Sequence, residues 1–249
     1  MMNICFDVAR QIERYARANE RREVCGFVLE SSGAQWFYLC ANTAADPEAY
    51  FSVSADDWLR AENHGDIAAV VHSHPENEPF LSPADRSSQV HTGLPWILYT
   101  GGRLKTFRCC PPLRGRVFEY GEYDCGALVR DAYMLAGIDL PDHVRTDLDG
   151  DAENQQLIKH IEACGFVRVS DGSLQAGDVF LTCTGGRPDH AALYLGNGEM
   201  LHHAYNQLSR REPYNAFWRD FTHSVWRHPQ WEPEMIQAIE NDLVYSAGL

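Results

Sequence analysis

The sequence predicts two domains, an α/β domain followed by an α+β domain, and three observations lead to this prediction. The 249 residues suffice for two cores of about 100 to 150 residues each. Strand-length apolar runs are mixed with helical patterns up to residue 107, whereas helices come first and strands follow beyond residue 117. Between them lies CCPPLRGR at 109–116, whose paired prolines continue neither a helix nor a central strand. We therefore expect domains at 1–107 and 118–249, joined by a linker at 108–117.

The first domain is expected to open with a helix, because apolar residues between positions 5 and 20 recur at the spacing of one helix face. A second helical stretch, SADDWLRAENHGD, lies between apolar runs that are bounded by turn residues and rich in β-formers. The expected strands are CGFVLE, QWFYLC, IAAVVHSH and PWILYTG. This order fits a mixed α/β domain.

The second domain is expected to begin with two helices, at DCGALVRDAYMLAG and around ENQQLIKHIEACG. Strands at GDVFLTC, HAALYLG and EMLHHAY follow. Helices followed by strands joined through short turns are typical of an α+β domain with an antiparallel sheet.

Charge and cysteine usage exclude several classes of protein. The net charge of −14, from 35 acidic and 21 basic residues, disfavours nucleic acid as a partner. Charged residues interrupt every apolar run at the start of the chain, so we expect neither a secretory signal nor insertion into a membrane, and we expect folding in the cytosol of the producing cell. The eight cysteines include no CxxC pair and are expected to be reduced thiols.

A candidate metal site lies in the first domain. His72 and His74 are two residues apart on an expected strand, so both side chains project from the same face. Ser82 is placed to cap a helix, which puts Asp85 at the third helical position, near the end of that strand. Two imidazoles and one carboxylate leave a fourth position for water, as in catalytic zinc sites. An upstream glutamate such as Glu23 is the right kind of group to take a proton from that water.

A simpler interpretation is that Ser82 and Asp85 only cap a helix and that the histidines are polar residues at a strand end. The combined pattern E-V-C-G-F, H-S-H-P and S-P-A-D favours a catalytic site. It resembles the JAMM (MPN-plus) metalloprotease family over residues 5–107. That family has a mixed sheet flanked by helices, binds Zn²⁺ and cleaves peptide or isopeptide bonds.

The JAMM resemblance also implies a role for each site residue. The metal ligands would be His72, His74 and Asp85. Glu23 would be the general base and Ser82 the group that stabilises the oxyanion. Glu30 competes for the role of the base, but it follows the CGFVL run instead of preceding it.

A second candidate site contains Cys125. Asp124 is a plausible helix N-cap, so the thiol lies in the first turn, where the helix dipole favours the thiolate. Two expected strands joined by Asn-Gly supply histidines that could serve as the base. A two-residue turn would put His203 on the face of His190, whereas a three-residue turn would favour His202. The competing interpretation of Cys125 is a buried helix cysteine.

The segments YDCGALV, GDVFLT and HAALYLGNGEMLHH resemble the NlpC-type (papain-like) cysteine peptidases of bacterial cell-wall turnover, across residues 118–228. The resemblance implies that Cys125 attacks, His190 is the base and His202, at the family's usual interval, orients the imidazole. Gly126 stands where the commoner pattern has serine, and the family's upstream tyrosine is assigned to Tyr120.

A JAMM domain followed by an NlpC-type domain resembles the tail assembly protein K family of lambda-like phages. The resemblance implies a tail-tip component made in the host cytoplasm, with other tail-tip proteins as partners. It also implies that the cysteine domain cleaves peptidoglycan stem peptides, at the γ-D-glutamyl to diaminopimelate bond. Two alternatives remain open: a structural adaptor that uses enzyme-like folds as docking surfaces, and an isopeptidase acting on a ubiquitin-like protein.

Overall fold

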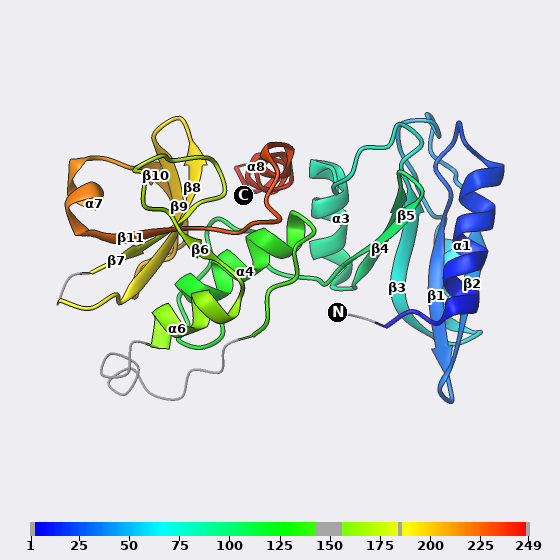
Figure 1. Ribbon diagram of the computed structural model, residues 1–249. Coiled ribbons are helices and arrows are strands. Elements are labelled where there is room, and N and C mark those ends of the chain that lie inside the picture. Colours follow the sequence, from blue (N-terminus) through cyan, green and yellow to red (C-terminus); the bar gives the residue numbers. More distant parts are fainter. Residues whose placement is uncertain (1–2, 143–155, 184–185, 248–249) are drawn as a thin grey trace. The chain divides into compact units, whose positions relative to one another are not determined.

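The computed structural model describes residues 3–142, 156–183 and 186–247 (Figure 1). The chain forms two compact units, Met1–Cys110 and Pro111–Leu249, and each is described by itself. The predicted fold class is confirmed, since each unit combines one sheet with helices. None of the helices in these described ranges is long and apolar enough to cross a membrane.

The first unit is built on a mixed five-stranded sheet. In spatial order its strands are β2 (Ala34–Cys40), β1 (Cys25–Ser31), β3 (Asp66–Ser73), β4 (Trp96–Thr100) and β5 (Arg103–Phe107). β3 and β4 pair in parallel, and the other neighbours pair antiparallel. The parallel pair needs a crossover, which the chain makes through α3 (Pro83–Thr92). The crossover returns the chain beside the end of β3, where the histidines lie.

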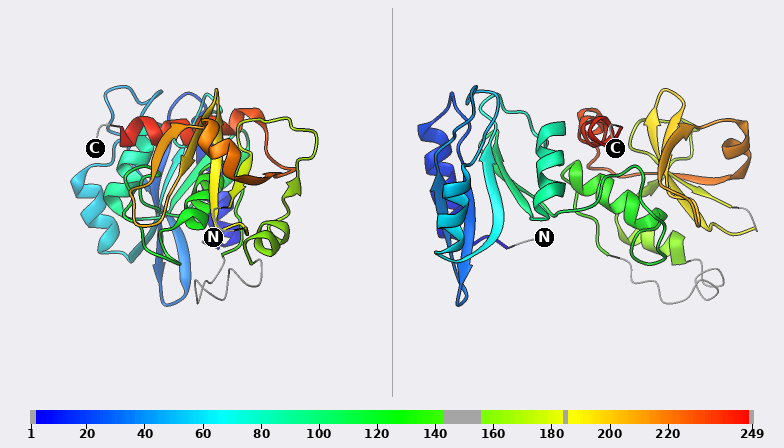
Figure 2. Two further views of the ribbon diagram at one scale, coloured as in Figure 1. Left: turned by 90° about the vertical axis from the view of Figure 1, so that its left-hand side faces the viewer. Right: turned by 180° about the vertical axis from the view of Figure 1, so that it is seen from behind.

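Helices cover both faces of this sheet. α1 (Phe6–Ala18) lies on one face and α3 on the other (Figures 1 and 2). α1 buries Val8 and Ile12 against the sheet, and each such side chain contributes about 1.5–3 kcal/mol of transfer free energy. α2 (Ala55–Glu62) packs Trp58 edge-on against Phe27 of β1, with ring centroids 4.6 Å apart.

The second unit contains a six-stranded antiparallel sheet. In spatial order its strands are β10 (Arg210–Pro213), β9 (Glu199–His202), β8 (His190–Gly196), β7 (Val179–Thr182), β11 (Thr222–Arg227) and β6 (Val167–Arg168). Its helices are α4 (Cys125–Leu135), α6 (Gln156–Ala163), α7 (Ala216–Phe221), the short 3₁₀ helix η1 (Pro233–Met235) and α8 (Ile236–Ser246). α4 packs against β8 and β9.

Some elements differ from the sequence prediction. The last expected strand ends at His202 instead of Tyr205, because the chain then turns through Asn206, whose φ is +55°. The helix expected around 153–165 is described from Gln156 onward, and residues 153–155 lie outside the described residues. β10 was not expected from the sequence, since RREP has the charge and proline of an edge strand.

Candidate active sites

His72, His74 and Asp85 form a cluster at the end of β3. Nε2 of His72 lies 3.1 Å from Nε2 of His74. Oδ2 of Asp85 lies 3.5 Å from the first of these nitrogens and 3.3 Å from the second. Nδ1 of His74 contacts the carbonyl oxygen of Glu78 at 2.9 Å, which turns Nε2 toward the cluster. The three residues therefore present one ligand atom each to a common point.

This donor set fits a metal ion. Ligand atoms around a tetrahedral zinc with bonds of 2.0–2.1 Å lie about 3.3 Å apart, and the three observed separations are 3.1, 3.3 and 3.5 Å. Imidazole nitrogens and carboxylate oxygens are common zinc ligands. Two histidines with one carboxylate leave the fourth tetrahedral position open. The residues therefore fit a metal ion with one coordination position left open.

Aromatic rings hold His72 in place. Phe51 stacks on its imidazole with ring centroids 4.8 Å apart, and Trp96 contacts it edge-on at 5.2 Å. His72 is fully buried. The first of the three candidate ligands is thus fixed by packing, which preorganises the cluster.

Strand pairing brings Glu23 to the same cluster. Cys25 of β1 pairs with His72 of β3, and the amide of Ser73 donates to the carbonyl of Val24 at 3.0 Å. Glu23 directly precedes Val24 and interacts electrostatically with His74 and Asp85. Burial raises the pKa of Glu23 to about 7, with His74 opposing the shift. A carboxylate with this pKa is suited to accept a proton near neutral pH. Glu30 lies at the far end of β1, paired with Asp66.

Ser82 caps α3 in the way the sequence predicts. Its Oγ accepts the amide hydrogen of Asp85 at 3.1 Å, and Oδ2 of Asp85 accepts the amide hydrogen of Ser82 at 2.8 Å. Burial raises the pKa of Asp85, but the two neighbouring histidines outweigh that effect and hold the pKa well below its usual range. Because Oγ is the acceptor in the cap, its own proton remains available for donation.

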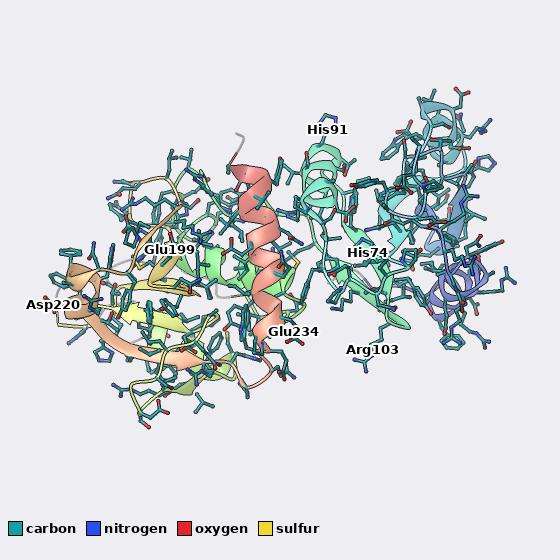
Figure 3. The ribbon with its side chains drawn as sticks, turned by 90° about the horizontal axis from the view of Figure 1, so that it is seen from above. His74, His91, Arg103, Glu199, Asp220 and Glu234 are labelled. Carbon is teal, nitrogen blue, oxygen red and sulfur yellow. The ribbon has the colours of Figure 1, made fainter. Side chains whose placement is uncertain are left out.

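A cavity of about 500 Å³ reaches His74 from the surface of the first unit. Its wall includes Arg17 of α1, Ser73, and Gly101 in the turn between β4 and β5. Figure 3 labels His74 and shows its side chain beside the sheet. Of the three clustered residues, His74 is the one that lines this cavity.

Cys125 begins α4 in the second unit, and its side chain is half-buried. Asp124 caps the helix, and its Oδ1 accepts the amide hydrogens of Gly126 and Ala127, both at 3.0 Å. The thiol therefore lies at the positive end of the helix dipole, as predicted. α4 packs against β8 and β9, which carry the histidines. Tyr120 lies half-buried in the turn that leads to the helix.

His190 and His202 are hydrogen-bonded to each other through their rings. Nε2 of His190 lies 3.1 Å from Nδ1 of His202. Ala192 pairs with His202, so both histidines project from the face of Ala192. Burial lowers the pKa of His190 to about 3 and that of His202 to about 4, so both rings are neutral at pH 7.

The hairpin has the two-residue turn that the sequence allowed, but the register expected for a three-residue turn, which places His202 on the face of His190. The turn has two residues, Asn197 and Gly198, with φ of +51° and +75°, as in a type I′ turn. Leu195 is a β-bulge, because Tyr194 pairs with Met200 while Gly196 pairs with Glu199. The extra residue shifts the register as a longer turn would.

His203 has a different environment from His202. Its Nε2 lies 3.0 Å from the carbonyl oxygen of Gln207, and Phe118 packs edge-on against its ring. Burial lowers its pKa.

Known proteins resemble both units. A model of prokaryotic homologs of the JAB domain matches residues 7–110, and a model of the NlpC/P60 family matches residues 115–227. Tail tip assembly protein K of Escherichia phage lambda is 50% identical over 194 residues, which cover 77% of this chain and 97% of that protein. The protein of the same name from Escherichia phage N15 is 34% identical over 87% of this chain and 92% of its own length. The chain belongs to the tail tip assembly protein K family.

A solved structure is also similar to part of this family member. It is an NLP/P60 family protein, similar to a lipoprotein, from Staphylococcus aureus, with 23% identity and a TM-score of 0.33. The match covers 46% of this chain and 37% of that one.

Three residues beside the histidines were missed by the sequence analysis of this K family member. Glu212 lies with Oε1 3.0 Å from Nε2 of His202, and the same oxygen accepts a hydrogen bond from Nε1 of Trp218 at 2.7 Å. Arg210 donates from Nε to Oε2 of Glu212 at 2.8 Å. Their only signal in the sequence is a charged, aromatic-rich stretch after the hairpin, which carries no recognisable spacing.

Proposed function

We propose that this K family protein is a phage tail-tip component with two separate peptidase sites. The second unit would hydrolyse peptidoglycan stem peptides, at the γ-D-glutamyl to diaminopimelate bond. The observation that carries this proposal is the histidine pair. A neutral His190, hydrogen-bonded to His202, lies on the strand against which the cysteine helix packs. A base held by a third group is the arrangement that a cysteine nucleophile requires.

The residues of the second unit define a sequence of steps. Cys125 gives its proton to His190 and its sulfur attacks the carbonyl carbon of the scissile amide. His190 then returns the proton to the leaving amine, and a thioester remains on Cys125. Water, deprotonated by the same histidine, hydrolyses the thioester and restores the thiol. His202 keeps the imidazole of His190 in position throughout.

For the first unit we propose a zinc peptidase site held by His72, His74 and Asp85. Zn²⁺ bound by such a set supplies Lewis-acid activation of water. Glu23, with its raised pKa, takes a proton and delivers it to the leaving amine. Ser82 donates its hydroxyl hydrogen to the developing oxyanion. The cavity beside His74 admits the peptide.

The proposed task of the zinc site is processing of a protein during tail assembly. Both relatives are named for tail tip assembly, and a site that cleaves peptide or isopeptide bonds would act there on a tail protein. The partners would then be other tail-tip proteins, met in the host cytoplasm during assembly and later in the virion tail.

Digestion of purified peptidoglycan tests the cysteine site. Wild type, Cys125→Ala and the matched control Cys183→Ala, which removes another half-buried thiol of the same unit, are compared by mass spectrometry of the released muropeptides. We expect wild type and Cys183→Ala to release the same fragments, cut at the γ-D-glutamyl bond, and Cys125→Ala to release none. Equal release by Cys125→Ala would refute the assignment. No release by any protein, including assembled tails, would favour the adaptor interpretation.

A further inference from the structure

A carboxylate lies directly behind the histidine pair of the second unit. Oε1 of Glu212 is 3.0 Å from Nε2 of His202, and Nδ1 of the same ring is 3.1 Å from Nε2 of His190. In this row of side chains, His202 faces Glu212 with Nε2 and His190 with Nδ1. His190 faces His202 with its own Nε2. Glu212 comes from β10 and so adds a third strand to the two that carry the histidines.

The carboxylate is held on two sides and is ionised. Nε of Arg210 donates to Oε2 at 2.8 Å, and Nε1 of Trp218 donates to Oε1 at 2.7 Å. Burial raises the pKa of Glu212, but these donors and His202 outweigh it and lower the pKa below its usual range. The ring of Trp218 packs on both histidines, with centroids 4.8 Å from His202 and 5.9 Å from His190.

An ionised carboxylate can only accept hydrogen bonds, and this restriction decides where the protons lie. A nitrogen lone pair 3.0 Å from an ionised oxygen would be repelled, so Nε2 of His202, which faces Oε1 at that distance, carries the hydrogen. The ring is neutral, so its Nδ1 has a lone pair. His190 faces that lone pair with Nε2, so Nε2 carries the hydrogen and Nδ1 has the lone pair. The nitrogen of His190 that remains for the thiol is therefore the one able to accept a proton.

We infer that Glu212 is a positioning residue that fixes the tautomers of His202 and, through it, of His190, so that Nδ1 of His190 is the proton acceptor. The inference rests on the proposed cysteine peptidase function of this unit. It extends the Cys125, His190 and His202 arrangement by a fourth member that does not touch the substrate. Arg210 and Trp218 support it by orienting the carboxylate.

The double variant Trp218→Phe/Glu212→Gln reverses this order without changing the shape of the side chain at position 212. Nε1 of Trp218 donates to the oxygen that faces His202, so the Trp218→Phe change removes that competing donor, and Trp218→Phe alone is the background control. The guanidinium of Arg210 then holds the amide oxygen, so the amide nitrogen of glutamine faces His202. An amide donates, so Nε2 of His202 becomes the acceptor and Nδ1 takes the hydrogen. His190 then carries its hydrogen on Nδ1 and cannot take a proton from the thiol. Glu199→Gln is the matched control, because Glu199 lies on β9 and pairs with Arg211 instead of a histidine.

Long-range ¹H–¹⁵N spectra of histidine-labelled full-length protein report the tautomers directly. In wild type and in Glu199→Gln we expect both His190 and His202 as Nε2–H tautomers at pH 7, assigned by comparison with His190→Gln and His202→Gln. In Trp218→Phe alone we expect the same Nε2–H pattern, and in Trp218→Phe/Glu212→Gln we expect both as Nδ1–H tautomers. An Nδ1–H tautomer at His202 in wild type, or an unchanged Nε2–H pattern in a folded double variant, would overturn the inference. The wild-type spectrum decides even if the variant does not fold.

Kinetics separate this inference from the proposed function. On peptidoglycan we expect Trp218→Phe/Glu212→Gln to lower kcat at least about 100-fold relative to Trp218→Phe with KM unchanged, because an inverted tautomer removes the base but not the binding surface. Trp218→Phe/Glu212→Asp, which keeps an acceptor, should restore part of that loss. If wild type cleaves no peptidoglycan while the spectra show the expected tautomers, the proposed function fails and the inference stands. If wild type cleaves and Trp218→Phe/Glu212→Gln retains the kcat of Trp218→Phe, the inference fails and the function stands.

Discussion

Ser82 and Asp85 are joined by two reciprocal hydrogen bonds, and one atom serves two purposes. Oδ2 of Asp85 accepts the amide hydrogen of Ser82 at 2.8 Å and faces the nitrogens of His72 and His74 at 3.5 and 3.3 Å. The sequence allowed Asp85 to be a helix cap or a metal ligand. The structure shows that the same carboxylate can be both. The cap fixes the carboxylate before any ion binds.

Removal of the cap hydroxyl should destabilise the first unit. We expect Ser82→Ala to lower the free energy of unfolding by about 1 kcal/mol, because Oγ accepts the amide hydrogen of Asp85. Ser54→Ala is the control, since Ser54 caps α2 in the same way, accepting from the amide of Asp57. Denaturant unfolding should show similar losses for both variants. Only Ser82→Ala should also impair processing of tail proteins, and equal processing by both would remove the oxyanion role of Ser82.

Loss of a metal ligand should remove bound zinc. We expect wild type to hold one zinc ion and Asp85→Asn or His74→Ala to hold far less, measured by elemental analysis after dialysis. Removal of zinc from wild type should lower the melting temperature of the first unit, because ligand binding to the native state adds about 2.7 kcal/mol at a hundred times the Kd. His91→Ala, at the last turn of α3, should retain the ion. Zinc retained by Asp85→Asn and His74→Ala alike would exclude this cluster as the site.

Glu23→Gln should abolish the zinc-dependent reaction while leaving the metal in place. The amide keeps the size of the side chain but cannot take a proton, and loss of a general base costs about 10²–10⁴-fold in rate. Phage carrying this variant should accumulate unprocessed tail proteins, seen by mass spectrometry of assembled tails. Glu30→Gln, at the other end of β1, is the control. Normal cleavage of every tail protein by Glu23→Gln would refute the processing role.

The buried histidines should make the second unit less stable in acid. Burial lowers the pKa of His190 to about 3, whereas a histidine in the unfolded chain has a pKa of about 6.5. The unfolded state therefore binds the proton first, so stability is greatest above about pH 6.5 and falls toward pH 3, by at most about 1.4 kcal/mol per pH unit for each such histidine. Burial also lowers the pKa of His202, so this histidine adds to the loss of stability in acid.

Denaturant unfolding between pH 7 and pH 4 checks this dependence. The slope of the unfolding free energy against pH should be shallower in His190→Gln than in wild type. His223→Gln, which changes an exposed histidine of the same unit, should keep the wild-type slope. Equal slopes for wild type and His190→Gln would contradict the burial effect.

Local patterns in the sequence predicted the parts of the sites that depend on short spacing. Strand alternation placed His72 and His74 together, and cap chemistry placed Asp85 and Cys125 in the first turns of their helices. The choice between His202 and His203 depended on a bulge at Leu195, which has no signature in an apolar run. Glu212 was missed because its strand, RREP, reads as a charged loop and becomes a strand only by pairing with β9.

We infer that the two proposed sites act independently of each other, and one set of preparations tests this claim. Zinc content and muropeptide release are measured on the same samples of wild type, Cys125→Ser and His72→Ala. We predict that Cys125→Ser keeps one zinc ion and releases no muropeptide, whereas His72→Ala loses the zinc and releases muropeptides at the wild-type rate. Loss of release in a folded His72→Ala, or loss of zinc in Cys125→Ser, would contradict the claim.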